Sequence, residues 1–130
     1  DLDTKSGKEM PWRLQPDIAG GGYFYDLAPH QIDLLQDLFG VITRAHGYPA
    51  NRAHLYDAED TVSACFFFES GIPASGSWCF VGHESAKEDC IEVIGDKGSL
   101  SFSVFTYQPS EVITSEGRSS ITVANPPYVQ

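Results

Sequence analysis

The stretch GGGYFYDLAPHQIDLLQDLFG, residues 20–40, decides the fold. Three glycines open it, apolar residues recur at helical spacing from Phe24 onward, and Gly40 closes it. This pattern predicts a helix over residues 22–39 that ends at Gly40. The rest of the chain is best interpreted relative to the two sides of this helix.

The two sides differ in chemistry. With a turn of about 100° per residue, one stripe of the helix carries Asp26, His30, Asp33 and Asp37. The apolar residues fall within an arc of about 160° on the other side, and they are Phe24, Leu27, Ala28, Ile32, Leu35, Leu38 and Phe39. We expect the apolar arc to face the core and the stripe to face solvent or another domain.

Asp26 and His30 form the most informative pair on the stripe. A carboxylate one helical turn from an imidazole can hold the ring in one orientation and make it a base for an alcohol proton. Two alternatives remain open: an incidental histidine on a solvent-facing stripe, and a metal site made by Asp26, His30 and Asp33. Pro29 either kinks the helix or is its first residue, and in the second case Asp26 precedes the helix.

The segments around the helix are of other kinds. Residues 1–19 are polar, contain Pro11 and Pro16, and are predicted to be a leading arm. Residues 46–60 are predicted to be a loop with at most one short strand. Three hairpins follow, with turns at residues 70–71, 95–98 and 116–117. The sequence therefore predicts an α+β domain with an open, mostly antiparallel sheet of about six strands and the helix packed on one face.

The first predicted hairpin has two unlike faces. Val62, Ala64, Phe66 and Phe68 alternate with Ser63, Cys65 and Phe67. A face of small polar groups mixed with cysteine and phenylalanine suits contact with another subunit, and the alternative is an ordinary solvated sheet face.

Composition excludes some classes of partner. The net charge is −10 and the eight basic residues are scattered, so we expect neither nucleic acid nor an anionic membrane surface as a partner. No run of about 18 apolar residues is present, which excludes a membrane-spanning helix. Three cysteines without a CxxC motif favour reduced thiols and a cytoplasmic setting.

A family resemblance adds to this interpretation. The segment PWRLQPDIAGGGYFYDLAPHQIDLLQDLFG, residues 11–40, resembles the start of the C-terminal domain in the glucose–fructose oxidoreductase, inositol dehydrogenase and MocA family. Weaker matches to the same family follow in residues 59–78, 91–102 and 126–130. The family pattern fits at Trp12, Arg13, Gly20, Gly21, Gly22, Asp26, His30, Asp33, Leu38 and Gly40.

The resemblance implies a fold and a domain role. Residues 1–130 would be the C-terminal substrate and oligomerisation domain of a larger oxidoreductase, of the type found in glyceraldehyde-3-phosphate dehydrogenase. The full-length protein would use NAD or NADP, held mainly by an N-terminal Rossmann domain, to oxidise or reduce a sugar, a polyol or a related hydroxy compound. The sheet face would make a homo-oligomer.

The resemblance also assigns roles to single residues. His30 would be the general acid or base for the substrate hydroxyl, and Asp26 would orient it. Trp12 and Arg13 would bind substrate. Gly21 and Gly22 would leave room for the cofactor, or would simply allow a tight turn into the helix.

Two departures from the family limit what this chain does alone. Ala28 stands where the family usually has glycine. No G-x-G-x-x-G motif lies between a strand and a helix, so we expect these residues alone to bind no dinucleotide and to be inactive. The alternative function is a non-catalytic oligomerisation or ligand-binding module with the same fold.

Overall fold

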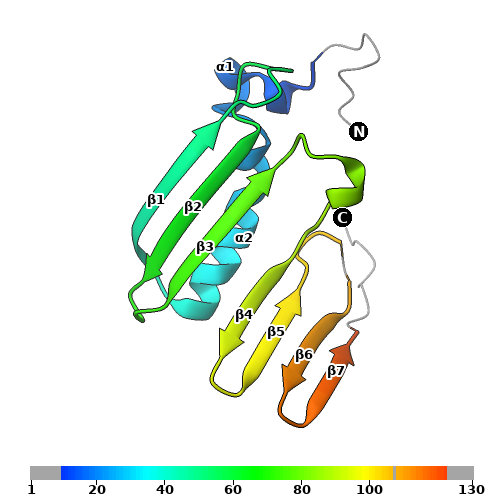
Figure 1. The fold of residues 1–130 in the computed structure, drawn as a ribbon. Coiled ribbons are helices and arrows are strands. Elements are labelled where there is room, and N and C mark those ends of the chain that lie inside the picture. The colour runs from blue at the N-terminus through cyan, green and yellow to red at the C-terminus, as the bar shows by residue number, and fades with distance from the viewer. Residues whose placement is uncertain (1–9, 107, 123–130) are drawn as a thin grey trace, which may run out of the picture. The chain divides into compact units, whose positions relative to one another are not determined.

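The computed structural model describes residues 10–106 and 108–122. Two compact units divide the chain between Ala86 and Lys87. Among the described residues, the helices and three strands belong to the first unit, and four strands belong to the second (Figure 1).

The first unit is a three-stranded antiparallel sheet with one long helix, α2 (Tyr23–Phe39), on one face (Figure 1). The strands run in the order β1 (Ile42–Ala50), β2 (Thr61–Phe68), β3 (Pro73–Cys79). A short 3-10 helix, η3 (Glu84–Ala86), follows β3.

Aromatic contacts join α2 to the sheet. Phe24 packs edge-on against Trp78 of β3 with ring centroids 5.1 Å apart, and the indole N–H of Trp78 donates to Gln31 Oε1 at 2.6 Å. Phe39, at the other end of the helix, packs on Phe68 of β2 with centroids 5.7 Å apart. The predicted apolar arc therefore faces the sheet, as expected from its period.

The two faces of β2 differ as the alternation predicts. Val62, Phe66 and Phe68 are buried, whereas Cys65 and Phe67 are exposed. The register places Gly47 of β1 and Gly76 of β3 beside Ala64 on the helix side. At Gly76 the ring of Trp78 fills the space that a side chain would take.

Two short helical turns precede α2. They are η2 (Trp12–Leu14) and α1 (Pro16–Ala19). Leu14 is only 1 % exposed and forms a core cluster with Tyr56 and Ala58. The prediction of a polar arm over residues 1–19 is therefore wrong for residues 12–19, because one leucine anchors the segment in the core; residues 1–9 lie outside the described part.

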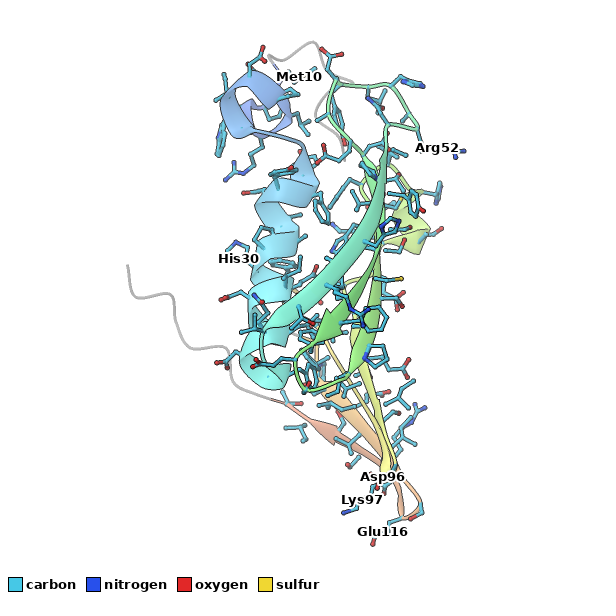
Figure 2. All side chains as sticks on the ribbon, turned by 90° about the vertical axis from the view of Figure 1, so that its left-hand side faces the viewer. Met10, His30, Arg52, Asp96, Lys97 and Glu116 are labelled. Carbon is cyan, nitrogen blue, oxygen red and sulfur yellow. The ribbon has the colours of Figure 1, made fainter. Side chains whose placement is uncertain are left out.

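The second unit is a four-stranded antiparallel sheet with the order β4 (Ile91–Gly95), β5 (Gly98–Phe102), β6 (Ser110–Thr114), β7 (Gly117–Ile121). Two-residue turns close its hairpins, and Asp96, Lys97 and Glu116 lie together at one end of it (Figure 2). The loop between β5 and β6 is held by the Asp89 carboxylate, which accepts from the backbone N–H of Val104 and Phe105.

The α+β class, the antiparallel strands and the helix on one face are confirmed. All three predicted hairpins are present, with Gly71, Gly98 and Gly117 at positive φ in or beside their turns. The structure has a seventh strand, β1, which begins before and extends into residues 46–60, predicted to be a loop with at most one short strand. Small residues and Pro49 hide its alternation, and proline is tolerated there because β1 pairs only with β2 and lies at the edge of its sheet.

Two details of the helix prediction are corrected. Leu38 is 52 % exposed, because it lies at the margin of the apolar arc. The helix begins at Tyr23 and continues through Pro29, so the alternative in which Pro29 is the first helical residue is wrong.

Candidate functional site

The outward side of α2 carries the candidate residues. His30 is exposed and lies on the side of the helix that faces away from the strands (Figure 2). Asp33 and Asp37 are also exposed on this stripe. The predicted position of the stripe, clear of the hydrophobic core, is therefore confirmed.

Asp26 lies in the first turn of α2. Because the helix is continuous through Pro29, Asp26 and His30 stand about one turn apart, about 6 Å along the axis. Gly40 ends the helix at φ 90°, and its N–H donates to the carbonyl oxygen of Gln36.

Arg13 reaches Asp26 from η2. Its Nε donates to Asp26 Oδ2 at 2.8 Å, and its guanidinium lies over the Trp12 ring at 4.6 Å from the centroid. The sequence predicted each of these residues for the site but not the contact between Arg13 and Asp26, which are 13 residues apart.

A shallow, open hollow lies beside the predicted base. Residues Pro29, His30, Ile32, Asp33 and Gln36, all on α2, line it. A hollow formed by one helix surface can contact a small molecule on one side only, so a closed substrate site here needs further protein.

Gly21 and Gly22 are both buried, and packing accounts for them. An added Cβ at Gly22 would lie 2.5 Å from the carbonyl oxygen of Glu59, and one at Gly21 would overlap the Tyr25 ring. The Gly22 N–H donates to Glu59 Oε1 at 3.0 Å. These contacts support the tight-turn alternative, and the cofactor role of the two glycines stays a prediction.

No group of three or more metal-ligating side chains is found in the described part of the chain. Asp26, His30 and Asp33 share the stripe but do not form such a group. The metal alternative therefore has no support from the geometry of these residues.

Asp60 is a buried carboxylate that fastens the loop before β2. It is 1 % exposed and accepts from the backbone N–H of Arg52 and Ala53 and from Thr61 Oγ1. Burial acts to raise its pKa, but the hydrogen bonds from Ala53, Arg52 and Thr61, with the nearby His54, hold the pKa below its usual value of 3.8. The family resemblance of residues 59–78 includes Asp60 without giving it a role, although a carboxylate directly before a strand is a signal for such a loop.

Tyr56, like Asp60, is a buried residue with a polar group. It is 4 % exposed, and its hydroxyl has no hydrogen-bond partner among the described residues. Burial, followed by the neighbouring Asp60, raises its pKa to about 12. This hydroxyl stays protonated, and Tyr56 belongs to the core cluster.

The other face of the sheet is also unusual. Arg44 lies over the Phe67 ring at 4.7 Å from the centroid, and His46 Nε2 is 3.0 Å from Tyr48 Oη. Tyr48 is 70 % exposed and Phe67 is 41 % exposed. The mixed character predicted for this face is therefore confirmed.

A family model describes most of this chain. The model of the GFO/IDH/MocA C-terminal domain matches residues 2–101. A curated oxidoreductase of Formosa agariphila is 39 % identical over 98 residues, which cover 75 % of this chain and 29 % of that protein. The chain thus spans less than a third of the length of this relative.

Solved structures share the fold. Levoglucosan dehydrogenase in complex with NADH and levoglucosan superposes with a TM-score of 0.76 at 23 % identity, over 98 % of this chain and 37 % of that one. An NAD-binding oxidoreductase of Klebsiella pneumoniae gives a TM-score of 0.70 at 18 % identity, over 90 % of this chain and 35 % of that one. At these identities the likeness is one of fold. In the part of the chain that the structure describes, no helix has both the length and the apolar character needed to cross a membrane.

Proposed function

Because the chain belongs to the GFO/IDH/MocA family through its C-terminal domain, we propose that it is the substrate-binding and acid–base domain of an NAD(P)-dependent oxidoreductase. The substrate class is a sugar, a polyol or a related hydroxy compound. The observation that carries the proposal is the exposed His30, one turn after Asp26 on the outward side of α2.

The chain's residues handle the proton of the reaction. In the oxidative direction His30 takes the proton from the substrate hydroxyl while the carbon loses a hydride, and in the reductive direction His30 returns the proton. Asp26 orients the imidazole and stabilises its protonated form. Trp12 and Arg13, both exposed beside Asp26, bind the substrate.

The nicotinamide cofactor supplies or accepts the hydride when it is bound. The described residues offer no strand-to-helix glycine loop for its pyrophosphate. The space beside the Gly22 Cα is already occupied by the carbonyl oxygen of Glu59. We therefore assign most of the cofactor site to an N-terminal Rossmann domain outside this sequence. These residues alone are expected to be inactive, and Gly21 and Gly22 approach the cofactor only through their backbone.

The full-length protein also uses the outer face of the sheet for self-association in this proposal. Exposed aromatic residues among small polar ones, such as Tyr48 and Phe67, suit a subunit interface better than a solvated surface. The free thiols of Cys65, Cys79 and Cys90 accord with a reducing compartment such as the cytoplasm. Light scattering that gives the mass of one subunit at high concentration would refute the interface.

The test of the catalytic role is His30→Ala in the full-length protein. Turnover with NAD⁺ or NADP⁺ and a sugar panel that includes levoglucosan and L-sorbose is expected to fall by about 10²-fold or more. The matched control is His83→Ala, since His83 is an exposed histidine that bonds Ser85 in the loop after β3. Near-normal kcat in His30→Ala would favour the non-catalytic module that keeps the same fold.

A further inference from the structure

Arg13 contacts two other residues of the candidate site. Its Nε is 2.8 Å from Asp26 Oδ2, and its guanidinium lies on the Trp12 ring at 4.6 Å. The 3-10 turn that carries it is fixed by Leu14, which is 1 % exposed. The guanidinium is therefore held by the Trp12 ring and by the Asp26 carboxylate. The next residue of the same turn, Leu14, is buried in the core.

We propose that Arg13 is a positioning residue for the acid–base pair: it fixes the Asp26 carboxylate and balances its charge, and so sets the orientation and the protonation of His30. This inference rests on the proposed function of His30. It gives Arg13 a role in addition to the substrate binding proposed above.

A stabilising role alone does not account for this contact. The Arg13 and Asp26 side chains are 46 % and 36 % exposed, and ion pairs at that exposure contribute little to stability. The ion pair of the second unit, Arg118 with Glu111, is longer at 3.5 Å and joins neighbouring strands. The pair at Asp26 is shorter, and the arginine also stacks on a ring, which fixes its geometry further.

The charges around His30 give the inference a measurable consequence. From α2 itself the stripe carries Asp26, Asp33 and Asp37, and Glu59 binds the start of the helix. On η2 the charged residue is Arg13. The strand faces that meet α2 are apolar in the described residues, with Val62, Phe66 and Phe68 on β2 and Trp78 on β3.

Among the described residues, Arg13 is the cation that an ion pair joins to a carboxylate of this stripe, that of Asp26. Without it the negative charge of Asp26 would act unbalanced on the imidazole one turn away, and the protonated form of His30 would be favoured. Loss of the Arg13 contact would also allow the Asp26 carboxylate to change its orientation. A catalytic pair works less well when one of its two groups is displaced.

The test compares three full-length variants with the wild type: Arg13→Gln, Arg13→Lys and the control Arg118→Gln, which also loses an arginine from an exposed ion pair. Diethyl pyrocarbonate reacts with the unprotonated imidazole, and peptide mass spectrometry gives the reaction rate of each histidine as a function of pH. In Arg13→Gln we expect the midpoint for His30 to move up by about half a pH unit to one pH unit. His46, His54 and His83 in the same sample should not move.

The conservative variant separates charge from geometry. Arg13→Lys keeps the charge, so the His30 midpoint should equal the wild-type value, while kcat should be about tenfold below that of the wild type because lysine cannot reproduce the planar contact with Asp26 and Trp12. Arg118→Gln should change neither quantity. An unchanged His30 midpoint in Arg13→Gln, or a rise in KM alone, would overturn the inference. That result is independent of His30→Ala, whose normal turnover would instead refute the proposed function.

Discussion

Two adjacent residues of η2, Arg13 and Leu14, belong to regions that differ in their exposure to solvent. Leu14 enters a buried region formed with Tyr56, Ala58 and the neighbouring Asp60, whereas Arg13 points to an exposed region formed with Trp12, Asp26 and His30. In the buried region the polar carboxylate of Asp60 is surrounded by donors. In the exposed region, water competes for every charged group.

This difference in exposure separates residues that stabilise the fold from residues that we propose take part in the reaction. Substitutions in the buried region should change the free energy of unfolding, because packing and desolvated hydrogen bonds are lost. An exposed ion pair contributes only about 0–1 kcal/mol to stability, so we attribute the contact of Arg13 with Asp26 to the proposed function rather than to stability. Stability measurements on the buried region test the first half of this contrast, as the activity measurements above test the second.

The largest stability effect is expected for Leu14→Ala. The side chain is 1 % exposed, and truncation of a buried leucine costs about 3 kcal/mol through lost burial and the cavity that remains. The measurement is denaturant unfolding of the full-length protein, in which the unfolding transition of this domain is monitored. Because Leu14 anchors η2, the contact between Arg13 and Asp26 should loosen as well.

Leu38→Ala is the matched control. Leu38 lies on α2 but is 52 % exposed, so its truncation should cost less than about 1 kcal/mol. Equal losses in the two variants would mean that the assignment of Leu14 to the core and Leu38 to the surface is wrong, and the contrast between the two regions would fail with it.

A smaller loss, about 2 kcal/mol at neutral pH, is expected for Asp60→Asn. Both carboxylate oxygens of Asp60 accept hydrogen bonds, and an amide nitrogen in place of one oxygen would face the N–H of Arg52 or Ala53. Asp57→Asn is the control, since Asp57 is exposed in the same loop and should change stability by less than about 0.5 kcal/mol.

The pH dependence of Asp60 has a definite sign. Its pKa in the folded protein is lowered below the usual 3.8, so its contribution is complete above about pH 4 and is lost as the pH falls through the lower, folded value. The wild type and Asp60→Asn should therefore converge in stability as the medium becomes more acidic. A difference that grows below pH 4 would contradict the assignment of Asp60 as an ionised acceptor.

Local patterns predicted part of this contrast, and long-range contacts explain the rest. The period of residues 22–39 was enough to place His30 outside the core, and turn glycines such as Gly71 and Gly98 were enough to place hairpins. The position and length of β1 were not predicted because Ala45, Gly47 and Pro49 give no alternation. The contact of Arg13 with Asp26 depends on the path of the chain between η2 and α2, which no local pattern specifies.

The burial of Leu14 illustrates the same limit. It stands between exposed residues and prolines in a segment with no helical or strand period, so its partners Tyr56 and Ala58 could not be read from its neighbours. The candidate site was therefore predicted residue by residue, while the support that holds it in place was not.

The smallest effect, and the one of opposite sign, is expected for Tyr56→Phe. The hydroxyl of Tyr56 is buried without a hydrogen-bond partner among the described residues, so its removal ends a desolvation cost and should stabilise the protein by up to about 1 kcal/mol. Burial and the nearby Asp60 raise the pKa of Tyr56 to about 12 from 10.0. In the wild type, stability should fall between about pH 10 and pH 12, where the unfolded chain has lost this proton and the folded chain keeps it.

Tyr48→Phe is the control for this variant, because the Tyr48 hydroxyl is exposed on β1 and lies 3.0 Å from His46 Nε2. Its removal should cost a few tenths of a kcal/mol at most, and the alkaline fall in stability should stay as in the wild type. In Tyr56→Phe that fall should shrink. A loss of more than about 1 kcal/mol in Tyr56→Phe would mean that the hydroxyl has a partner in the full-length protein, and the buried region would then extend beyond the residues of this chain.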